Sequence, residues 1–431
     1  MKRFVSTILL LMFAVALFSG CGQQGPTDST PSDQKEITIW LKKALTDVSN
    51  EMLLDRCEQF GIDKGVKVNV EVLAYEDFYS KWAAAIESGN LPDVTYIDDI
   101  AARQFYDEGL LLDVEDLYQN INTESAFSES LTAAMSDDGS HYAIPAWTSS
   151  QVLYYRKDLL EAANVEVPTT WEEFREVAIA TTDLENGIYG AGIGFGAANS
   201  DADQFIRMLM WGFGSKECED GKVVIDSPES VAAAEYVKQL FLEDRVTPPN
   251  SINWDDSGNN KAYLSGQCAM IFNTGSIYNS LKTDDPELFE KTGIAAIPAG
   301  PAGSFPLGII DGYAVFKSAR NVELGKELID YLMDVEWYSN WVEDSAPLQL
   351  PVFPELAEND IWKEEANKAF LDNAQSYVYY GYPDELTAAA AEVSNLRLYN
   401  TAFQDILTET TDVATAIAEL QTALEGVYYE Q

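Results

Sequence analysis

The chain has 431 residues, which at roughly 150 residues per domain predicts two or three domains, or one body with two lobes. Hydrophobic residues make up 46% and charged residues 23%, which are globular proportions and exclude a disordered or collagen-like chain. A net charge of −44, from 71 acidic and 27 basic residues, argues against nucleic acid or a basic patch on anionic lipid as partners.

The N-terminal residues predict a targeting segment and a tether rather than part of the folded protein. Lys2 and Arg3 precede an apolar run at 8–18, which is shorter than the about 20 residues of a membrane-spanning helix and predicts a signal peptide over residues 1–20. The sequence Phe18-Ser19-Gly20-Cys21 resembles the bacterial lipobox, in which the cysteine carries lipid. Residues 21–35 then predict a lipidated Cys21 and a flexible tether. The alternative is a secreted protein whose cysteine is incidental.

Alternating strands and helices over residues 36–97 predict a mainly parallel sheet with right-handed crossovers. Strands are expected at 36–41 and 66–72, where polar and apolar residues alternate, and at 93–97. A helix is expected at 47–60, and a second one has an apolar face made by Phe78, Trp82, Ala85 and Ile86.

Later signals predict a second α/β unit that begins after residue 145. Thr170 and Glu173 form a capping box that opens a helix. Ser227 before Pro228 predicts the start of another helix. The remaining predicted elements are a strand at 309–316, a helix at 324–332 and nearly continuous helix from about 384 to 424.

Motifs for catalysis, nucleotides and metals are weak. The glycines at 190, 192, 194 and 196 overlap a formal dinucleotide fingerprint, but their spacing of two favours a strand with one bare face. The acidic loop at 255–260 lacks the spacing and closing glutamate of a calcium loop. The single histidine, His141, has no motif partner. We expect no catalytic residue, metal or cofactor, and buried thiols at Cys57, Cys218 and Cys268, with one disulfide among them as the alternative.

Aromatic residues at strand ends and in loops favour a carbohydrate cleft. Trp40 ends the first strand, Trp147 follows Pro145, Trp254 lies in a polar loop, and Tyr380 lies in an aromatic turn at 379–383. Flat rings stack on the C–H face of a sugar while polar side chains bond its hydroxyls. We therefore expect Trp147→Ala to weaken binding with little loss of stability. Aromatics at helical spacing are instead expected in the core: Phe78, Trp82, Trp337 and Trp341.

An ordered set of segments resembles the extracellular solute-binding proteins of ABC sugar importers, the maltose-binding-like group. The resemblance runs from about Ile37 to Leu424. Its pieces, in chain order, are Ile37-Thr38-Ile39-Trp40, Leu91-Pro92-Asp93-Val94, Gly109-Leu110-Leu111-Leu112-Asp113, residues 138–145, residues 152–160, residues 168–174, Gly266-Gln267-Cys268-Ala269-Met270 and residues 308–315.

The resemblance implies an α/β fold of two lobes, of the periplasmic-binding-protein type, joined by hinge strands with a ligand cleft between the lobes. The first lobe would comprise 36–145 plus about 309–345, and the second about 146–308 plus 346–431. The implied protein is a monomer, anchored through Cys21 to the outside of the bacterial cell membrane. It would capture a mono- or oligosaccharide without chemistry and deliver it to the permease of an ABC importer.

The resemblance also implies which residues bind the ligand. The first lobe would supply Trp40, Lys42, Asp98 and Asp99; the crossing strands Trp147, Ser149 and Asp311; and the second lobe Asn199, Trp254, Ser276 and Tyr380. Many relatives carry a stacking tryptophan where Ile277 stands here, so stacking would come from Tyr278, Trp254 or Tyr380.

Two other functions stay open at this point. Aromatics beside carboxylates also suit a cationic solute such as a polyamine. A secreted carbohydrate-active enzyme would use a similar cleft but would turn its ligand over.

Overall fold

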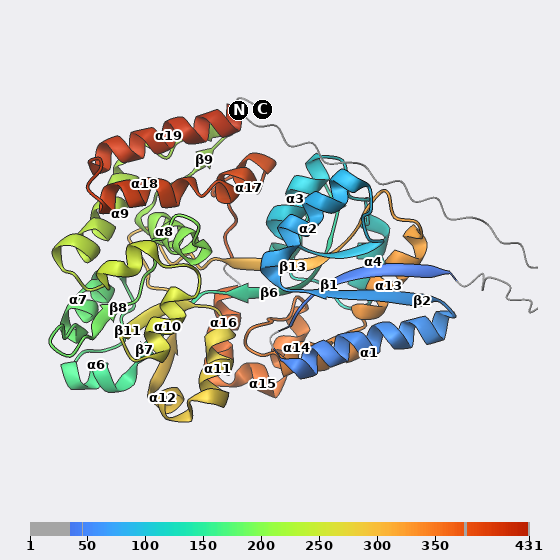
Figure 1. Cartoon of the computed structure of the whole chain (residues 1–431), viewed down its shortest axis with the longest axis horizontal. Helices are drawn as coiled ribbons and strands as arrows, with labels where there is room; N and C mark the ends of the chain where they lie inside the picture. The colour runs from blue at the N-terminus through green and yellow to red at the C-terminus, as the bar shows by residue number, and fades with distance from the viewer. Residues whose placement is uncertain (1–34, 45, 375–376, 430–431) are drawn as a thin grey trace, which may run out of the picture. The chain divides into compact units, whose positions relative to one another are not determined.

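Two β-sheets, each flanked by helices, organise the part of the chain described by the computed structural model, residues 35–44, 46–374 and 377–429 (Figure 1). The predicted signal peptide, Cys21 and nearly all of the predicted tether lie outside these residues. We call the five-stranded sheet with its helices the first lobe, and the four-stranded sheet with its helices the second lobe.

The first lobe is built on a sheet with the strand order β2-β1-β3-β13-β6. The strands are β1 (Glu36–Lys42), β2 (Lys67–Leu73), β3 (Val94–Asp98), β6 (Ile144–Ser150) and β13 (Gly308–Val315). β1 is parallel to β2 and β3, as predicted, whereas β13 is antiparallel to β3 and β6. The strands expected at 36–41, 66–72, 93–97 and 309–316 are all present, with ends within one residue of the prediction.

Helices cover both faces of this sheet. Figure 1 shows α2 (Tyr75–Ser88) and α3 (Asp99–Asp107) on one side, and α1 (Asp47–Lys64) and α14 (Val335–Asp344) on the other. Phe78, Trp82 and Trp341 are buried as predicted, while Trp337 is half-buried. The smaller elements of the first lobe are α4 (Glu115–Glu124), α5 (Glu129–Ala133), β4 (Ser136–Asp137), β5 (Ser140–His141) and α13 (Val322–Leu332).

The second lobe is built on a sheet with the order β12-β7-β11-β8. Its strands are β7 (Val152–Arg156), β8 (Tyr189–Ala191), β11 (Cys268–Asn273) and β12 (Thr292–Ala295), and a small hairpin pairs β9 (Cys218–Glu219) with β10 (Lys222–Val223). The sheet is mixed because β7 is antiparallel to β11 and β12, whereas β8 is parallel to β11.

The helices of the second lobe come from two separate stretches of chain. The earlier ones are α6 (Lys157–Ala163), α7 (Trp171–Thr181), α8 (Ser200–Phe213), α9 (Pro228–Lys238), η1 (Gln239–Glu243), η2 (Pro249–Asn253), α10 (Gly258–Leu264), α11 (Ser276–Asp284) and α12 (Pro286–Lys291). The predicted capping box at Thr170 and Glu173 opens α7, and Ser227 caps α9, as expected. The later ones are α15 (Asp360–Lys363), α16 (Glu365–Ala374), α17 (Ala388–Asn395), α18 (Leu398–Leu407) and α19 (Val413–Tyr429). They follow η3 (Pro354–Glu358), whose Glu355 accepts a hydrogen bond from Ser125 of the first lobe.

The glycine-rich stretch differs from its prediction. The expected strand exists only at Tyr189–Ala191, and residues 192–196 are irregular. A Cβ on Gly196 would lie 2.1 Å from the Trp254 carbonyl oxygen, and one on Gly192 would lie 2.8 Å from Cys268 Sγ. The missing side chains at Gly192 and Gly196 therefore let other segments pack closely, and these glycines do not form one face of a strand.

The chain crosses between the lobes at Gln151, which separates β6 from β7, and returns between β12 and β13. β6 still belongs to the first sheet, beyond the predicted start of the second lobe at residue 146. Leu350 pairs with Thr148, and Phe353 packs against Tyr338, so this later segment also contacts the first lobe. The exact lobe boundaries stay a prediction.

The return strand tolerates no side chain at its first residue. A Cβ on Gly308 would lie 1.7 Å from the Ser149 carbonyl oxygen on β6. We expect Gly308→Ala to lower the free energy of unfolding by about 1–3 kcal/mol through overpacking, as measured by urea denaturation. Gly426→Ala in α19 is the matched control, since no atom of the described residues lies within 4 Å of its Cβ position. An equal effect at both glycines would contradict this account.

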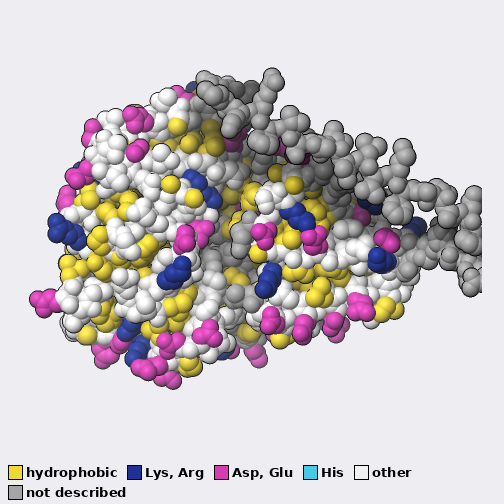
Figure 2. All heavy atoms as spheres, viewed as in Figure 1, with side chains coloured by type: hydrophobic (Ala, Val, Ile, Leu, Met, Phe, Trp, Pro, Cys, Tyr) yellow, Lys and Arg dark blue, Asp and Glu magenta, His cyan; other side chains and the backbone are white. Residues whose placement is uncertain are grey.

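On the face of the described residues that Figure 2 shows, acidic side chains are spread out rather than gathered in one patch. Figure 2 shows them at many separate points of the visible face of both lobes, with lysines and arginines between them. Such a distribution keeps a protein soluble and does not by itself indicate a cationic ligand.

Candidate functional site

A cavity of about 510 Å³ lies between the two lobes. This volume falls in the range of about 300–1,000 Å³ that is typical of small-molecule sites. The first lobe lines it with Tyr75, Tyr79, Asp98, Ile100 and Ile309. The second lobe lines it with Ser200, Gln204, Asp256, Tyr380, Asn395 and Arg397.

Asp98 organises the wall on the first lobe. It ends β3 and caps α3, where its Oδ1 accepts a hydrogen bond from the Ala101 amide at 2.8 Å. The hydroxyls of Tyr75 and Tyr79 donate to its Oδ2 at 3.3 and 3.0 Å. Burial raises the pKa of the Asp98 carboxyl above its ordinary value, while the Ala101 amide opposes that shift. Both tyrosine rings are therefore held in place before any ligand arrives.

A second polar group supports the same wall from behind. Lys42 Nζ lies 3.1 Å from both carboxylate oxygens of Asp311, which also accepts a hydrogen bond from the Tyr96 hydroxyl. The ammonium lies 4.8 Å from the centre of the Tyr75 ring, within the distance of a cation–π interaction. Asp311 lies on β13, where the register against β6 shifts, so the wall is tied to the return strand.

Asp99 lies beside the cavity and contacts a late segment of the chain. The Tyr377 hydroxyl lies 2.9 Å from Asp99 Oδ2 and 3.1 Å from the Gly308 carbonyl oxygen. Burial, followed by the charge of Asp98, raises the pKa of the Asp99 carboxyl well above its usual range. Asp99 Oδ1 has no hydrogen-bond partner among the described residues.

The wall on the second lobe centres on the start of α8. The Arg397 guanidinium donates to Ser200 Oγ at 2.8 Å and to the Ser394 carbonyl oxygen at 2.9 Å. Asp256 accepts hydrogen bonds from the amides of Ser200 and Asp201. Arg397 has a φ of 52°, a left-handed conformation that is uncommon for residues other than glycine and often found at functional sites.

Asp201, next to this wall, makes the stability of the second lobe depend on pH. Burial, opposed by the hydrogen bond from Asn259, raises the pKa of Asp201 to about 7, above an unfolded value near 4. The folded protein therefore binds this proton more tightly, and the stability gained is full below about pH 4 and lost as pH rises through 7. We expect unfolding free energy to fall by up to about 2.7 kcal/mol more between pH 5 and 8 in wild type than in Asp201→Asn. Parallel pH curves for the two proteins would refute this assignment.

Six of the residues predicted for the site lie in the cavity lining or next to it. Asp98 and Tyr380 line the cavity. Lys42, Asp99 and Asp311 lie directly behind its lining, through the contacts given above. Ser149 is buried on β6 opposite Ile309, which does line the cavity.

The remaining predicted residues serve the fold or lie elsewhere. Trp40 and Trp147 are 6% and 4% exposed, and both pack in the first lobe. Asn199 caps α8 and donates to the carbonyl oxygens of Trp254 and Asp255. Ser276 donates to Asn273 at the start of α11. Tyr278 lies in a separate cavity of about 410 Å³, with its ring 5.1 Å from Phe289.

Sequence reasoning missed most of the cavity lining. Tyr75 and Tyr79 lie on the helix whose apolar face was correctly predicted from Phe78 and Trp82, but two tyrosines one turn apart carry no specific sequence signal for a binding site. Asp256 lies in the acidic loop at 255–260, whose sequence carries no signal for sugar binding. Gln204, Asn395 and Arg397 carry no local signal, because long-range packing alone brings them to the cavity.

Other predictions concern the rest of the molecule. Cys57, Cys218 and Cys268 are free and buried, as expected, and burial raises the pKa of the Cys57 thiol to about 12. Within the described ranges, no three His, Cys, Asp or Glu side chains are grouped so as to hold a metal ion. No helix in the same part of the chain is both long and apolar enough to span a bilayer.

Comparison with known proteins identifies the family of this chain. The family model described as bacterial extracellular solute-binding protein matches residues 50–338. A Brucella abortus protein named as a binding protein is 26% identical over 308 residues, 71% of this chain and 73% of that protein. The maltooligosaccharide ABC transporter solute-binding lipoprotein of Streptococcus pneumoniae is 24% identical over 350 residues, 78% of each chain.

Solved structures show the same fold at low sequence identity. An ABC transporter solute-binding protein of Thermotoga lettingae, bound with α-D-tagatose, has a TM-score of 0.79 at 20% identity, covering 92% of this chain and all of that one. A maltose-bound protein of T. maritima has a TM-score of 0.77 at 22% identity, covering 90% and 99%. These matches confirm the predicted two-lobed fold class and the resemblance noted in the sequence. The chain therefore belongs to the family of bacterial extracellular solute-binding proteins.

Proposed function

We propose that this protein is the binding subunit of an ABC importer and captures a mono- or oligosaccharide in the cavity between its lobes. The observation that carries the proposal is the lining itself, in which three tyrosines lie among carboxylate, amide, hydroxyl and guanidinium groups supplied by both lobes. Aromatic rings suit the C–H faces of a sugar, and the polar groups suit its hydroxyls.

The charges in the lining favour a neutral ligand over a polyamine. Asp98 already accepts from a backbone amide and two tyrosines, and Asp256 from two backbone amides. Arg397 adds a cation to the same lining. A polyamine would face this guanidinium, whereas sugar hydroxyls can donate to the carboxylates and accept from the arginine.

Capture would work by a shift between open and closed forms. A ligand that contacts Tyr75 or Asp98 on one lobe and Tyr380 or Arg397 on the other makes both sets of contacts only when the lobes are closed. Binding therefore favours the closed form, which would then deliver the sugar to a membrane permease.

Cys21 would carry the lipid that holds the protein at the outer face of the membrane. We therefore expect Cys21→Ala to move the protein from the membrane fraction to the released fraction in cell fractionation.

A thermal-shift panel of neutral mono- and oligosaccharides, sugar acids, amino sugars and polyamines tests the proposal. We expect at least one neutral sugar to raise the melting temperature at saturating concentration, with the sugar recovered unchanged afterwards. Products in the recovered sample would instead indicate an enzyme. Stabilisation by polyamines alone would replace the sugar with a cationic solute.

A further inference from the structure

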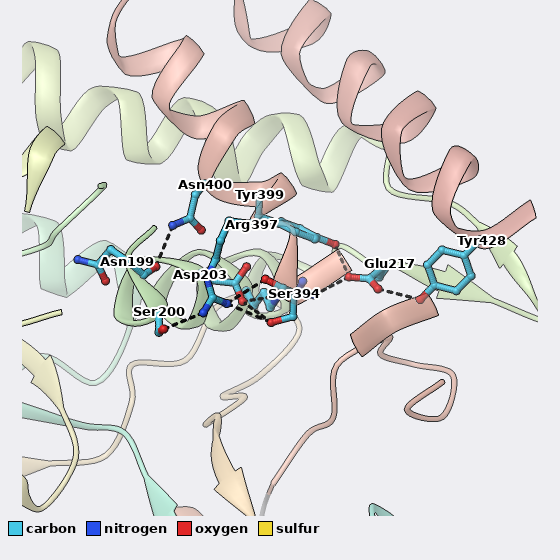
Figure 3. A network of polar contacts seen from close by, with 10 residues as sticks. Asn199, Ser200, Asp203, Glu217, Ser394, Arg397, Tyr399, Asn400 and Tyr428 are labelled. Carbon is cyan, nitrogen blue, oxygen red and sulfur yellow. Dashed lines mark hydrogen bonds and ion pairs between the residues drawn. The ribbon is translucent and has the colours of Figure 1, made fainter. Parts of the chain in front are cut away.

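A cluster of fully buried charges lies behind the wall of the cavity on the second lobe (Figure 3). Arg207 on α8 pairs with Asp203, at 3.0 Å between Nε and Oδ2, and with Glu217. Figure 3 shows the two carboxylates, Asp203 and Glu217, with their neighbours from the C-terminal helices. All three side chains are 0% exposed. We call Asp203, Arg207 and Glu217 the buried triad. Burying charges is costly, and apolar side chains of similar volume often serve stability equally well, so stability alone does not account for such a group.

The C-terminal helices add further hydrogen bonds to the buried triad, in which Arg207 Nη2 and Asp203 Oδ1 have no hydrogen-bond partner among the described residues. The hydroxyls of Tyr399 on α18 and Tyr428 on α19 both donate to Glu217 at 2.8 Å. Ser394 on α17 donates to Asp203 in a longer contact of 3.5 Å. Each of the last three helices thus places one hydroxyl on a carboxylate of the triad, as Figure 3 shows.

The same cluster contacts the residues that line the cavity. The Arg207 guanidinium lies 4.8 Å from the centre of the Tyr380 ring and 4.1 Å from that of Tyr399, within the range of cation–π contacts. Ser394, which bonds Asp203, also accepts from Arg397. Two side chains of the lining, Tyr380 and Arg397, are therefore each one contact away from the triad.

The helix that carries Ser394 also meets the first lobe. α17 contacts α3, which begins directly after Asp98. The orientation of α17 against α8 therefore affects both the wall of the cavity and the distance across it. We propose that Arg207 is a positioning residue for ligand binding, which acts through Tyr380 and the junction of α17 and α18 without touching the ligand. This inference rests on the proposed function of the same cavity.

Hydrogen–deuterium exchange on the ligand-free full chain tests the positioning without knowledge of the ligand. Lysine at position 207 keeps the charge but loses the planar fork that holds two carboxylates. We expect Arg207→Lys to speed amide exchange in residues 377–399 by about tenfold, which corresponds to about 1.4 kcal/mol, with β1 and β3 unchanged. The control is Arg175→Lys, which disturbs the ion pair of Arg175 with Asp244 in the same lobe. Uniform loss of protection, or the same pattern in both variants, would overturn the proposal.

A double-mutant cycle separates positioning from a merely structural role. With a sugar that binds wild type, we expect Arg207→Lys to raise the Kd about tenfold, and to have little further effect in a Tyr380→Ala background. Additive effects on Kd would mean that Arg207 does not act through Tyr380. If Arg207→Lys does not fold, Tyr399→Phe and Tyr428→Phe take its place in both experiments. Each of them removes one hydroxyl that donates to Glu217.

The two experiments distinguish failure of this inference from failure of the proposed function. If Arg207→Lys loosens residues 377–399 but wild type binds no sugar, the proposed sugar ligand is wrong and the positioning role of Arg207 stands. If Arg207→Lys binds sugar as wild type does and shows unchanged amide exchange, the positioning role of Arg207 is wrong and the proposed function stands.

Discussion

Replacing Trp147 with alanine is expected to lower the free energy of unfolding by about 3–5 kcal/mol, as for other large aromatic residues removed from a core. The indole is 4% exposed, and its ring centre lies 5.2 Å from Trp341, 5.8 Å from Tyr96 and 6.1 Å from Tyr313. This packing argues against the sequence-based expectation that the indole stacks on ligand and that its loss would spare stability.

Urea denaturation followed by circular dichroism measures this loss without depending on the fluorescence of the missing indole. Trp337→Ala is the matched control because that indole stacks on Trp341 at 5.9 Å but is only half-buried. The loss at Trp147 should be clearly the larger. A variant of normal stability that binds sugar poorly would restore the original interpretation.

Replacing Tyr380 with alanine is expected to weaken sugar binding by about 10–100-fold, or about 1.4–2.8 kcal/mol. The ring lines the cavity and is held from behind by the Arg207 guanidinium. Its orientation is therefore set before ligand binds, and little entropy is lost on stacking. Titration calorimetry at a temperature where circular dichroism shows a folded protein measures the change.

Two further variants make the Tyr380 result specific. Tyr380→Phe keeps the ring and should retain most of the affinity if stacking is the main contribution. Tyr278→Ala removes a tyrosine from the separate cavity beside Phe289 and should leave the affinity unchanged. Loss of binding in Tyr278→Ala with none in Tyr380→Ala would move the ligand to that second cavity.

The secondary structure was predictable where its signal is local. Strict alternation at 66–72 needs no knowledge of the rest of the chain, and β2 lies at 67–73. The capping box of α7 is likewise complete within Thr170 and Glu173. The stretch at 192–196 could not be predicted in this way, because its shape depends on Cys268 and Trp254, which approach from elsewhere in the chain.

The site was predictable only in part, for the same physical reason. Asp98 and Asp311 lie on strands that meet at the crossing between the lobes, and the family resemblance pointed to both. The prediction for the tryptophans was uncertain by nature, because an indole at the end of a strand can face either a cleft or a core. Trp147 packs into the core against Trp341, which lies far along the chain and so gives no local signal. The burial of Arg207 could not be predicted from the sequence, since a charged residue is expected at the surface and this one is fully buried.

The place of β13 between β3 and β6 in the first sheet also governs the order in which the chain can fold. β13 bonds to β3 on one side and to β6 on the other, and both strands are synthesised long before it. Until residue 315 is available, β3 and β6 each present an open edge to which another chain can pair. Contacts of such long sequence separation also slow folding. A fragment that ends before Gly308 should therefore aggregate, and the intact chain is most vulnerable to aggregation while it waits for its own return strand.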